Sequence, residues 1–326
     1  MKSFSYIYPK NLKAIPRLLA DYGDKALLYA GGTDALARLK DGIVQPEAVI
    51  NLKQVTELTE MKEDRAGLRI GAAVRLADIL DFAPAKAYPG LIEAVQSVGT
   101  IQLRNMGTIG GNLCQRPRCW YYRSSRFPCF RKGGELCYAI YGENKYHCIL
   151  GGDPCYIVHP SDVAPMLIAL DAEIEILGAK KSRRIKAETF YVLPEQDPYH
   201  ETVLAADEVV TQIIVPARAK RLKSHYLKFR ERDSFDFAMV SVAAAGRVEG
   251  DRLFEPRIVL GGVAPKPWRA LKTEAMLSGQ AISEELLLEA AKAELAQAAP
   301  LDKNEYKVPL VRNLIKRAVM EMMGKA

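Results

Sequence analysis

The sequence predicts an α+β protein that is built from more than one compact unit. Its 326 residues are enough for two or three cores. Strand-like apolar runs alternate with helical patterns in the first two thirds of the chain. In the last third, three consecutive strand-like runs precede two helical patterns. We therefore expect an alternating unit over residues 1–217 and an α+β unit over 218–326.

The elements of the first unit are predicted from switches between strand and helix periodicity. An aliphatic run is followed by a glycine turn and then by a helical pattern, and this order recurs along the chain. The expected elements are strand 26–30, helix 35–40, strand 48–52, strand then helix in 67–80, helix 89–99, helix then strand in 164–178, and strand 208–216.

The second unit is expected to begin near residue 218, within the basic run "ARAKRLK". Long apolar runs rich in valine and isoleucine indicate strands, and the alanine- and leucine-rich segments that follow have helical spacing. The expected elements are strands 225–231, 238–248 and 257–265, and helices 283–298 and 306–323.

Composition excludes several classes of protein. The chain is 49% hydrophobic and 26% charged, and it contains no apolar run long enough to cross a bilayer. The N-terminal "MKSFSYIYPK" lacks the pattern of a secretory signal, so we expect a cytoplasmic protein with reduced thiols, unless it is exported with a signal-bearing partner.

The net charge of +7 is unevenly distributed. Between residues 114 and 158, seven basic residues stand against three acidic ones, which leaves an excess of four positive charges. No recognisable nucleic-acid module accompanies this excess, so we expect no nucleic-acid binding. The charges could instead offset thiolates, or form a solvated basic loop.

The same region holds every cysteine of the chain: Cys114, Cys119, Cys129, Cys137, Cys148 and Cys155. Free core cysteines would not all fall in one segment. Structural zinc usually shows closely spaced cysteine pairs, which are missing. Aromatic residues in this segment could shield a metal cluster or form a small core of their own; these are Trp120, Tyr121, Tyr122, Phe127 and Phe130.

Two glycine clusters carry a second signal: "YAGGTDAL" at 29–36 and "TIGGNLC" at 108–114. Paired glycines after a strand let a ligand approach the backbone, whose N–H groups can bind an anion such as phosphate. Either cluster alone could be an ordinary tight turn. Neither fits the dinucleotide fingerprint or the Walker A motif.

Four motifs, in this order, resemble the FAD-binding medium subunit of molybdenum hydroxylases: "AGGTD", "TIQLRNMGTIGGNLCQ", "HPSDVAPMLIALDA" and "YLKFRERDSFDFAMVSVAAA". The resemblance spans nearly the whole chain. It implies a two-lobed FAD-binding domain of the vanillyl-alcohol oxidase type, with lobes at about 1–55 and 56–217, followed by a C-terminal flavoprotein domain with an antiparallel sheet and helices.

The resemblance also implies which residues hold FAD. The two glycine clusters would bind the diphosphate, Asp162 would hydrogen-bond the cofactor, and Lys228 would lie near the flavin. Read without the family, Asp162 could cap a helix and Lys228 could be a solvated strand residue. The expected diphosphate residues are Tyr29, Ala30, Gly31, Gly32, Thr33, Asp34, Ala35, Leu36, Thr108, Gly110, Gly111 and Asn112.

The chain departs from the common family pattern by a cysteine-rich insert at about 114–158. This insert resembles the aldehyde oxidoreductase and 4-hydroxybenzoyl-CoA reductase branches, where the equivalent loop binds a 4Fe-4S cluster. Such a cluster needs four converging thiolates. Matching the branches gives Cys119, Cys129, Cys137 and Cys155, with Cys148 as the alternative to Cys129.

The resemblance implies an electron-transfer subunit of an oxidoreductase, without catalytic residues of its own. Its partners would be a large subunit with the molybdenum cofactor, a small subunit with 2Fe-2S clusters, and an external electron carrier. Two other functions remain open: a zinc-stapled, nucleotide-binding interaction module, and a self-contained flavin oxidase. The sequence does not indicate the substrate, the electron direction or the carrier.

Overall fold

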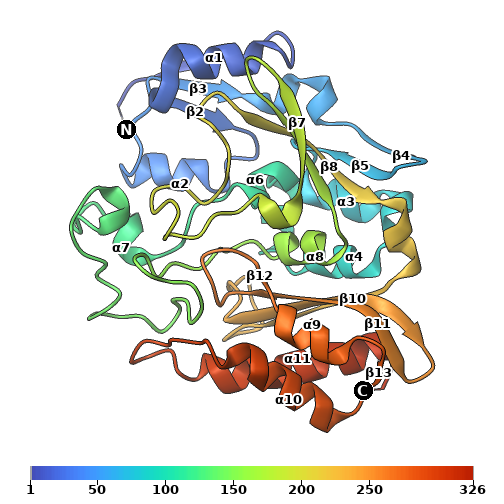
Figure 1. Ribbon diagram of the computed structural model, residues 1–326. Helices are drawn as coiled ribbons and strands as arrows, with labels where there is room; N and C mark the ends of the chain where they lie inside the picture. The colour runs from blue at the N-terminus through green and yellow to red at the C-terminus, as the bar shows by residue number, and fades with distance from the viewer. Residues whose placement is uncertain (1, 326) are drawn as a thin grey trace.

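The computed structural model describes residues 2–325, which form three β-sheets covered by helices (Figure 1). The N-terminal sheet and the C-terminal helices lie at opposite ends of the molecule, with the second sheet between them. The α+β fold class that the sequence predicts is confirmed. Within residues 2–325, no helix combines the length and the apolar character needed to cross a bilayer.

The first sheet is small and parallel, with strand order β1-β3-β2. Parallel neighbours require crossover connections, which helices supply here. Val49 and Ile50 of the central strand are buried, which explains why this strand is a continuous apolar run. The elements are β1 (Ser5–Ile7), α1 (Ala14–Tyr22), β2 (Ala26–Tyr29), α2 (Ala35–Lys40) and β3 (Ala48–Asn51).

The second sheet is antiparallel, with strand order β4-β5-β8-β6-β7. Its central strand, β8, is the last of the five in the chain and pairs with β5 on one side and β6 on the other. Its strands are β4 (Met61–Asp64), β5 (Gly67–Gly71), β6 (Glu173–Leu177), β7 (Ser182–Lys186) and β8 (Val209–Pro216). Its helices are α3 (Leu76–Asp81), α4 (Pro89–Gln96), α5 (Ile101–Met106), α6 (Ile109–Leu113) and α8 (Val163–Ala169).

The third sheet is also antiparallel, with strand order β12-β11-β10-β9, and β13 pairs with β11. Helices α9 and α11 contact one face, with α10 packed against both of them, and α4 and α8 contact the other face. Residues 240–246 are buried because both faces are covered. The elements are β9 (Lys223–Phe229), β10 (Val240–Glu249), β11 (Arg252–Gly261), β12 (Trp268–Arg269), α9 (Leu271–Leu277), β13 (Gln280–Ala281), α10 (Glu284–Leu295) and α11 (Lys307–Met323).

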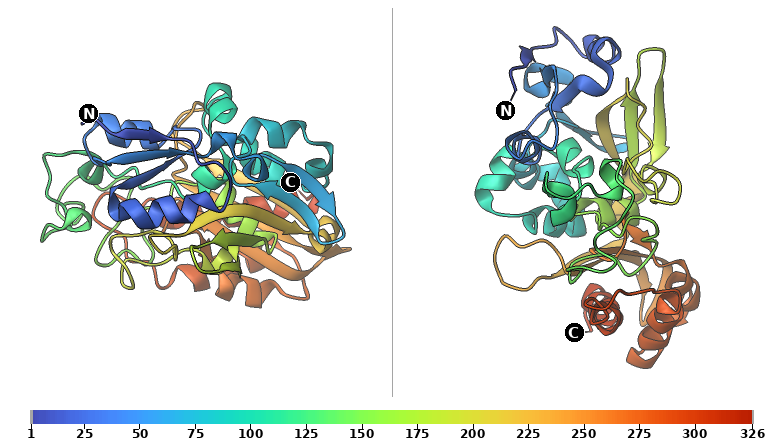
Figure 2. Two further views of the ribbon diagram at one scale, coloured as in Figure 1. Left: turned by 90° about the horizontal axis from the view of Figure 1, so that it is seen from above. Right: turned by 90° about the vertical axis from the view of Figure 1, so that its left-hand side faces the viewer.

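The cysteine-rich insert, residues 114–158, is largely irregular and carries only one short α-helix, α7 (Trp120–Arg123). It lies along one side of the molecule, beside both the first sheet and the C-terminal domain (Figures 1 and 2). Tyr121, Tyr122, Cys129 and Ala139 form a small buried cluster, separate from the main cores. The insert therefore has a core of its own, in which aromatic side chains pack beside cysteines.

Most of the elements expected from periodicity are present, but several short or polar ones were missed. Strand β7 is absent from the expected elements; its Arg183, Arg184 and Lys186 are charged, and its residues alternate between exposed and partly buried. It is the edge strand of its sheet, and such strands are commonly charged. Strand β1 was missed because three residues are too few to show a period.

Candidate functional site

The first glycine turn connects β2 to α2 and leaves backbone donors free. Among the hydrogen bonds of residues 2–325, none uses the N–H group of Gly31, Gly32 or Thr33. Gly32 has a φ of 74°, a conformation that side-chain-bearing residues rarely adopt. Consecutive free N–H groups in such a turn form a concave site for an anion.

The second turn packs directly against the first. A Cβ atom on Gly31 would run into the carbonyl oxygen of Met106, just before the second cluster, so glycine is required for this approach. Thr108 caps α6 by accepting a hydrogen bond from the Gly111 N–H at 3.2 Å. A Cβ atom on Gly111 would meet only the Thr108 Oγ1 atom, at 3.0 Å. Gly111 therefore faces open space, whereas Gly31 is needed for packing.

Two cavities meet at these turns. The first, called the turn cavity, has a volume of about 170 Å³ and is lined by 30–35, Arg38, Thr108, Gly111 and Cys114, among others. The second, called the bridging cavity, has a volume of about 230 Å³ and runs from Thr33 and Gly111 to Asp162 and Lys228. Most of the predicted diphosphate residues line one or both cavities, but Tyr29 and Leu36 line neither.

Asp162 and Lys228 form a buried ion pair at the far end of the bridging cavity. The Lys228 Nζ atom donates to Asp162 Oδ2 at 2.8 Å and to the Ser97 carbonyl at 3.0 Å, and the Tyr226 hydroxyl donates to Asp162 Oδ1 at 2.8 Å. Burial raises the pKa of the Asp162 carboxyl, and the charge of Lys228 opposes this shift. This pair is a fixed polar feature beside the cavity.

Of the two simpler interpretations of this pair, the one for Asp162 is right only as to its position, and the one for Lys228 is wrong. Asp162 occupies the N-cap position of α8, but its carboxylate makes no capping hydrogen bond, because it is bound by Tyr226 and Lys228. Ser161 performs the capping, by accepting from the Ala164 N–H at 3.0 Å. The side chain of Lys228 is only 4% exposed, so it is not a solvated strand residue.

Asp34, in the first turn, is surrounded by arginines. Its carboxylate oxygens lie 2.6 Å from Arg118 Nη1, 2.6 Å from Arg123 Nη2 and 3.4 Å from Arg38 Nε. The backbone N–H of Arg116 also donates to Asp34, at 3.1 Å. Burial alone would raise the pKa of Asp34, but the charges of Arg118, Arg123 and Arg38 together lower it. The carboxylate is thus ionised and neutralised.

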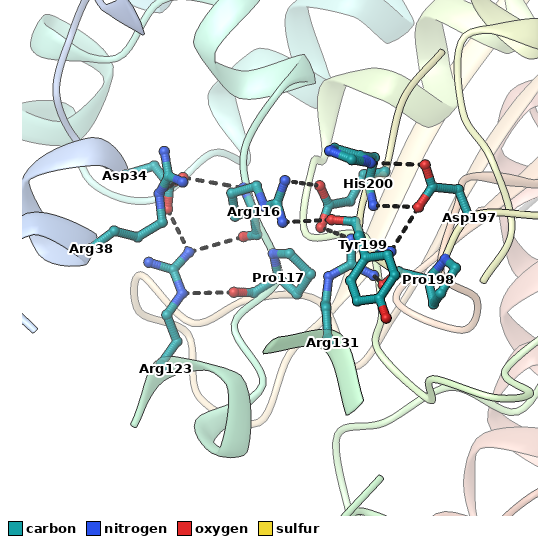
Figure 3. Close-up of polar contacts among 11 residues, drawn as sticks. Asp34, Arg38, Arg116, Pro117, Arg123, Arg131, Asp197, Pro198, Tyr199 and His200 are labelled. Carbon is teal, nitrogen blue, oxygen red and sulfur yellow. Dashed lines mark hydrogen bonds and ion pairs between the residues drawn. The ribbon is translucent and has the colours of Figure 1, made fainter. Parts of the chain in front are cut away.

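The insert is tied to residues 197–201 by a second group of contacts (Figure 3). The Arg116 side chain donates to the Tyr199 carbonyl at 2.8 Å and pairs with Glu201 at 3.1 Å. Arg131, whose side chain is 1% exposed, pairs with the other oxygen of Glu201 and donates to the Pro198 carbonyl at 2.6 Å. Ion pairs and backbone contacts therefore run continuously from Asp34 to Arg131.

Four cysteines surround a small space inside the insert, called the cysteine cavity. Cys119, Cys129, Cys137 and Cys155 line it, together with Arg131 and aromatic side chains. Its volume is about 10 Å³. Burial raises the pKa of Cys119 to about 12 and that of Cys155 to about 11. Without a bound cation these thiols are therefore protonated.

The other two cysteines lie elsewhere. Cys114 lines the turn cavity, and Cys148 is buried beside Gly152 and does not line the cysteine cavity. Within residues 2–325, no three or more histidine, cysteine, aspartate or glutamate side chains are arranged as a ready metal site. The four thiols face one space, but they are not positioned for coordination.

Contacts with the C-terminal domain hold the insert from the other side. Lys307, at the start of α11, is fully buried and donates to the carbonyls of Tyr146, His147 and Gly262 at 3.1, 2.9 and 2.7 Å. The Asn304 side chain donates to the carbonyls of His147 and Cys148, both at 3.1 Å. Burial lowers the pKa of Lys307 to about 7. These contacts fix the backbone of the insert next to Cys148.

A further cavity, of about 600 Å³, shares lining residues with both the cysteine cavity and the bridging cavity. Cys119 and His147 line both this space and the cysteine cavity, and Asp162 and Phe237 line both this space and the bridging cavity. The His147 Nε2 atom lies 3.2 Å from Cys119 Sγ. Cys119 of the cysteine cavity and Asp162 of the bridging cavity therefore line one common cavity.

Sequence reasoning missed several residues of this region. It noted an excess of basic residues near the cysteines but did not pair Arg118 or Arg123 with Asp34, because these partners are more than 80 positions apart. Nothing in the sequence singled out Glu201, because it belongs to no motif. Tyr226 was part of a recognised motif without being assigned a role.

Both parts of the chain match known protein families. Residues 2–218 match the FAD binding domain in molybdopterin dehydrogenase, and residues 224–322 match the CO dehydrogenase flavoprotein C-terminal domain. The aldehyde oxidoreductase FAD-binding subunit PaoB of Escherichia coli (strain K12) is 34% identical over 332 residues, with 100% of both chains covered. The glyceraldehyde dehydrogenase medium chain of Sulfolobus acidocaldarius is 28% identical over 325 residues, with 98% of both covered.

A solved structure shows the same fold. A chain of the carbon monoxide dehydrogenase from Hydrogenophaga pseudoflava, in a form that lacks the Mo-pyranopterin moiety of the molybdenum cofactor, superposes with a TM-score of 0.79 at 27% identity. The match covers 100% of this chain and 99% of that one. The chain therefore belongs to the family of FAD-binding subunits of molybdenum hydroxylases, which are flavoprotein subunits of oxidoreductases.

Proposed function

We propose that the turn cavity and the bridging cavity together bind FAD. The observation that carries this proposal is the junction of the two cavities at the glycine turns, where free N–H groups and the open face of Gly111 meet. The diphosphate would lie at this junction. The flavin end would extend toward Asp162 and Lys228, as the family motifs indicate.

The chain's own residues would bind and orient the cofactor. Backbone N–H groups of the first turn suit a dianion, and Thr108 fixes the second turn beside it. The Asp162–Lys228 pair gives the far end a fixed donor and a fixed acceptor. Bound FAD would supply the redox chemistry, and the protein would supply position and electrostatics.

We further propose that Cys119, Cys129, Cys137 and Cys155 hold a 4Fe-4S cluster. These four cysteines line the cysteine cavity, whereas Cys114 and Cys148 do not, and this difference supports the choice of ligands. The space is small, so the side chains must move apart on loading. A metal centre would also deprotonate thiols that burial otherwise keeps neutral.

These assignments give an electron-transfer subunit. Asp162 and Cys119 line one cavity, which would place the two cofactors beside the same space. We propose that the chain works with a molybdenum-cofactor subunit and a 2Fe-2S subunit, and that it exchanges electrons with an external carrier. The names "FAD-binding subunit" and "medium chain" of the relatives are consistent with such an assembly.

We propose domain limits of 1–217 for the FAD-binding part, with lobes meeting near residue 55, and 218–326 for the C-terminal part. The two family matches, 2–218 and 224–322, support a boundary between β8 and β9.

Serine variants test the cysteine assignment. Iron and acid-labile sulfide are counted per FAD in purified protein. Cys129→Ser should lose the cluster, about four irons per chain, whereas the matched control Cys148→Ser should keep it. The opposite result would move the fourth ligand to Cys148. Zinc in place of iron in the unmodified chain would favour the interaction-module alternative.

A further inference from the structure

We propose that Arg118 and Arg123, at the start of the cysteine-rich insert, act as positioning residues that neutralise Asp34, so that the first glycine turn can accept a diphosphate. Flavin binding would then depend on the fold of the insert. The inference rests on the proposed FAD site, because it explains how a turn that contains a carboxylate could bind an anion.

Asp34 would oppose that binding if it were left unpaired. It immediately follows the free N–H groups of Gly31, Gly32 and Thr33, and it lines both the turn cavity and the bridging cavity. Its side chain is 14% exposed, so water screens its charge only weakly. An isolated carboxylate at this position would repel a dianion in either cavity.

The insert supplies most of the compensating charge. Arg118 and Arg123 both approach the Oδ1 atom of Asp34 at 2.6 Å, whereas Arg38, from α2, lies 3.4 Å from Oδ2. Three arginines against one carboxylate leave two positive charges in excess. The neighbourhood of the turn is therefore cationic only when the insert is in place.

The insert holds these arginines by specific contacts. Arg123 donates from Nε to the Pro117 carbonyl at 2.7 Å and from Nη2 to the Arg116 carbonyl at 3.1 Å. Arg118 donates to the Gln115 side chain at 3.2 Å. Since such contacts form only in the folded insert, disordering it would leave Asp34 with only its longer contact to Arg38.

The connection continues to the cysteines. Arg116 pairs with Glu201, which also binds the buried Arg131 beside the cysteine cavity. Arg123 follows Tyr122 in α7, and Tyr122 packs with Cys129 in the core of the insert. Anything that orders the insert therefore also orders the arginines at the flavin turn.

The test is a charge-compensation series in the full-length chain, stripped of FAD and titrated with FAD at fixed ionic strength. The double variant Arg118→Gln/Arg123→Gln should raise the FAD Kd about tenfold, within the usual range of coupling between sites. Adding Asp34→Asn should restore the Kd to within about threefold of the unmodified chain. The matched control Arg126→Gln, an exposed arginine of the same segment, should leave it unchanged.

If Asp34→Asn restores the FAD Kd, the arginines act by neutralising Asp34 and not in another way. If Arg118 and Arg123 bound the diphosphate themselves, or only stabilised the fold, removing the carboxylate would not restore affinity, and the inference would be overturned. A double variant that binds FAD normally would overturn it too. If the double variant does not fold, Arg118→Gln with and without Asp34→Asn makes the same comparison. An unmodified chain that binds no FAD would instead refute the proposed function.

Discussion

Replacing Gly111 with alanine separates cofactor binding from folding at the second glycine turn. Gly111 lies within α6 and lines both the turn cavity and the bridging cavity. The added methyl group would meet only Thr108 Oγ1, at 3.0 Å, and would otherwise point into open space. The substitution therefore alters the cavity surface and little else.

The effect of Gly111→Ala on stability should be smaller than its effect on FAD affinity. Within a helix, alanine is favoured over glycine by about 1 kcal/mol, which offsets the small shift that Thr108 must make. We therefore expect the free energy of unfolding to change by less than about 1 kcal/mol. A methyl group that displaces the diphosphate by part of an ångström would weaken a charged hydrogen bond worth about 1.5–3 kcal/mol. The FAD Kd should then rise about 10- to 100-fold.

The assay combines FAD titration of the apo chain with denaturant unfolding. Gly110→Ala is the contrasting variant, because its Cβ atom would lie 2.7 Å from the Ala72 carbonyl oxygen and should destabilise the fold itself. If Gly111→Ala binds FAD as tightly as the unmodified chain, the diphosphate does not lie at this turn. Loss of stability without loss of affinity would likewise refute the reasoning.

Three further predictions concern other parts of the site. FAD should be held without a covalent bond, so acid precipitation should release all the flavin; yellow colour on the denatured chain would contradict this. Lys228→Met should lower the free energy of unfolding by about 3–5 kcal/mol, because it leaves the buried Asp162 carboxylate without its partner, and a loss below about 1 kcal/mol in denaturant titrations would contradict the pairing. Burial lowers the pKa of His159 from 6.5 to about 3, so the unfolded chain takes up a proton first and stability falls as pH decreases below 6.5. The His159 contribution to this loss should reach about 2 kcal/mol at pH 5, and His159→Gln should be less sensitive over the same range; equal sensitivity in both proteins would contradict it.

Local patterns predicted the elements that position the site. The strand at 26–30, its glycine turn and the helix at 35–40 follow from periodicity and from the conformational freedom of glycine, and the structure has all three. Family motifs predicted cofactor-binding roles for Asp162 and Lys228. The sequence could not show that they bind each other, because a strand and a helix from distant segments bring them together.

The contacts between the insert and the rest of the chain could not be predicted either, because the contacting residues are far apart in the sequence. The basic excess around the cysteines was visible, but which arginine meets Asp34 depends on how an irregular segment folds over α2. Glu201 is buried between Arg116 and Arg131 only because residues 197–201 pass beside the insert. The periodicity of a sequence predicts helices and strands, and it does not predict contacts between distant irregular segments.

The central claim, that this chain carries both FAD and a 4Fe-4S cluster for electron transfer, is tested most directly on the purified chain, free of other iron-containing subunits. FAD, iron and sulfide are counted per chain, and the visible spectrum is recorded before and after anaerobic reduction. The account predicts one FAD together with about four irons and four sulfides on this subunit, with both chromophores bleaching on reduction. Stoichiometric FAD with zinc, or with no metal, in the cysteine-rich insert would contradict it.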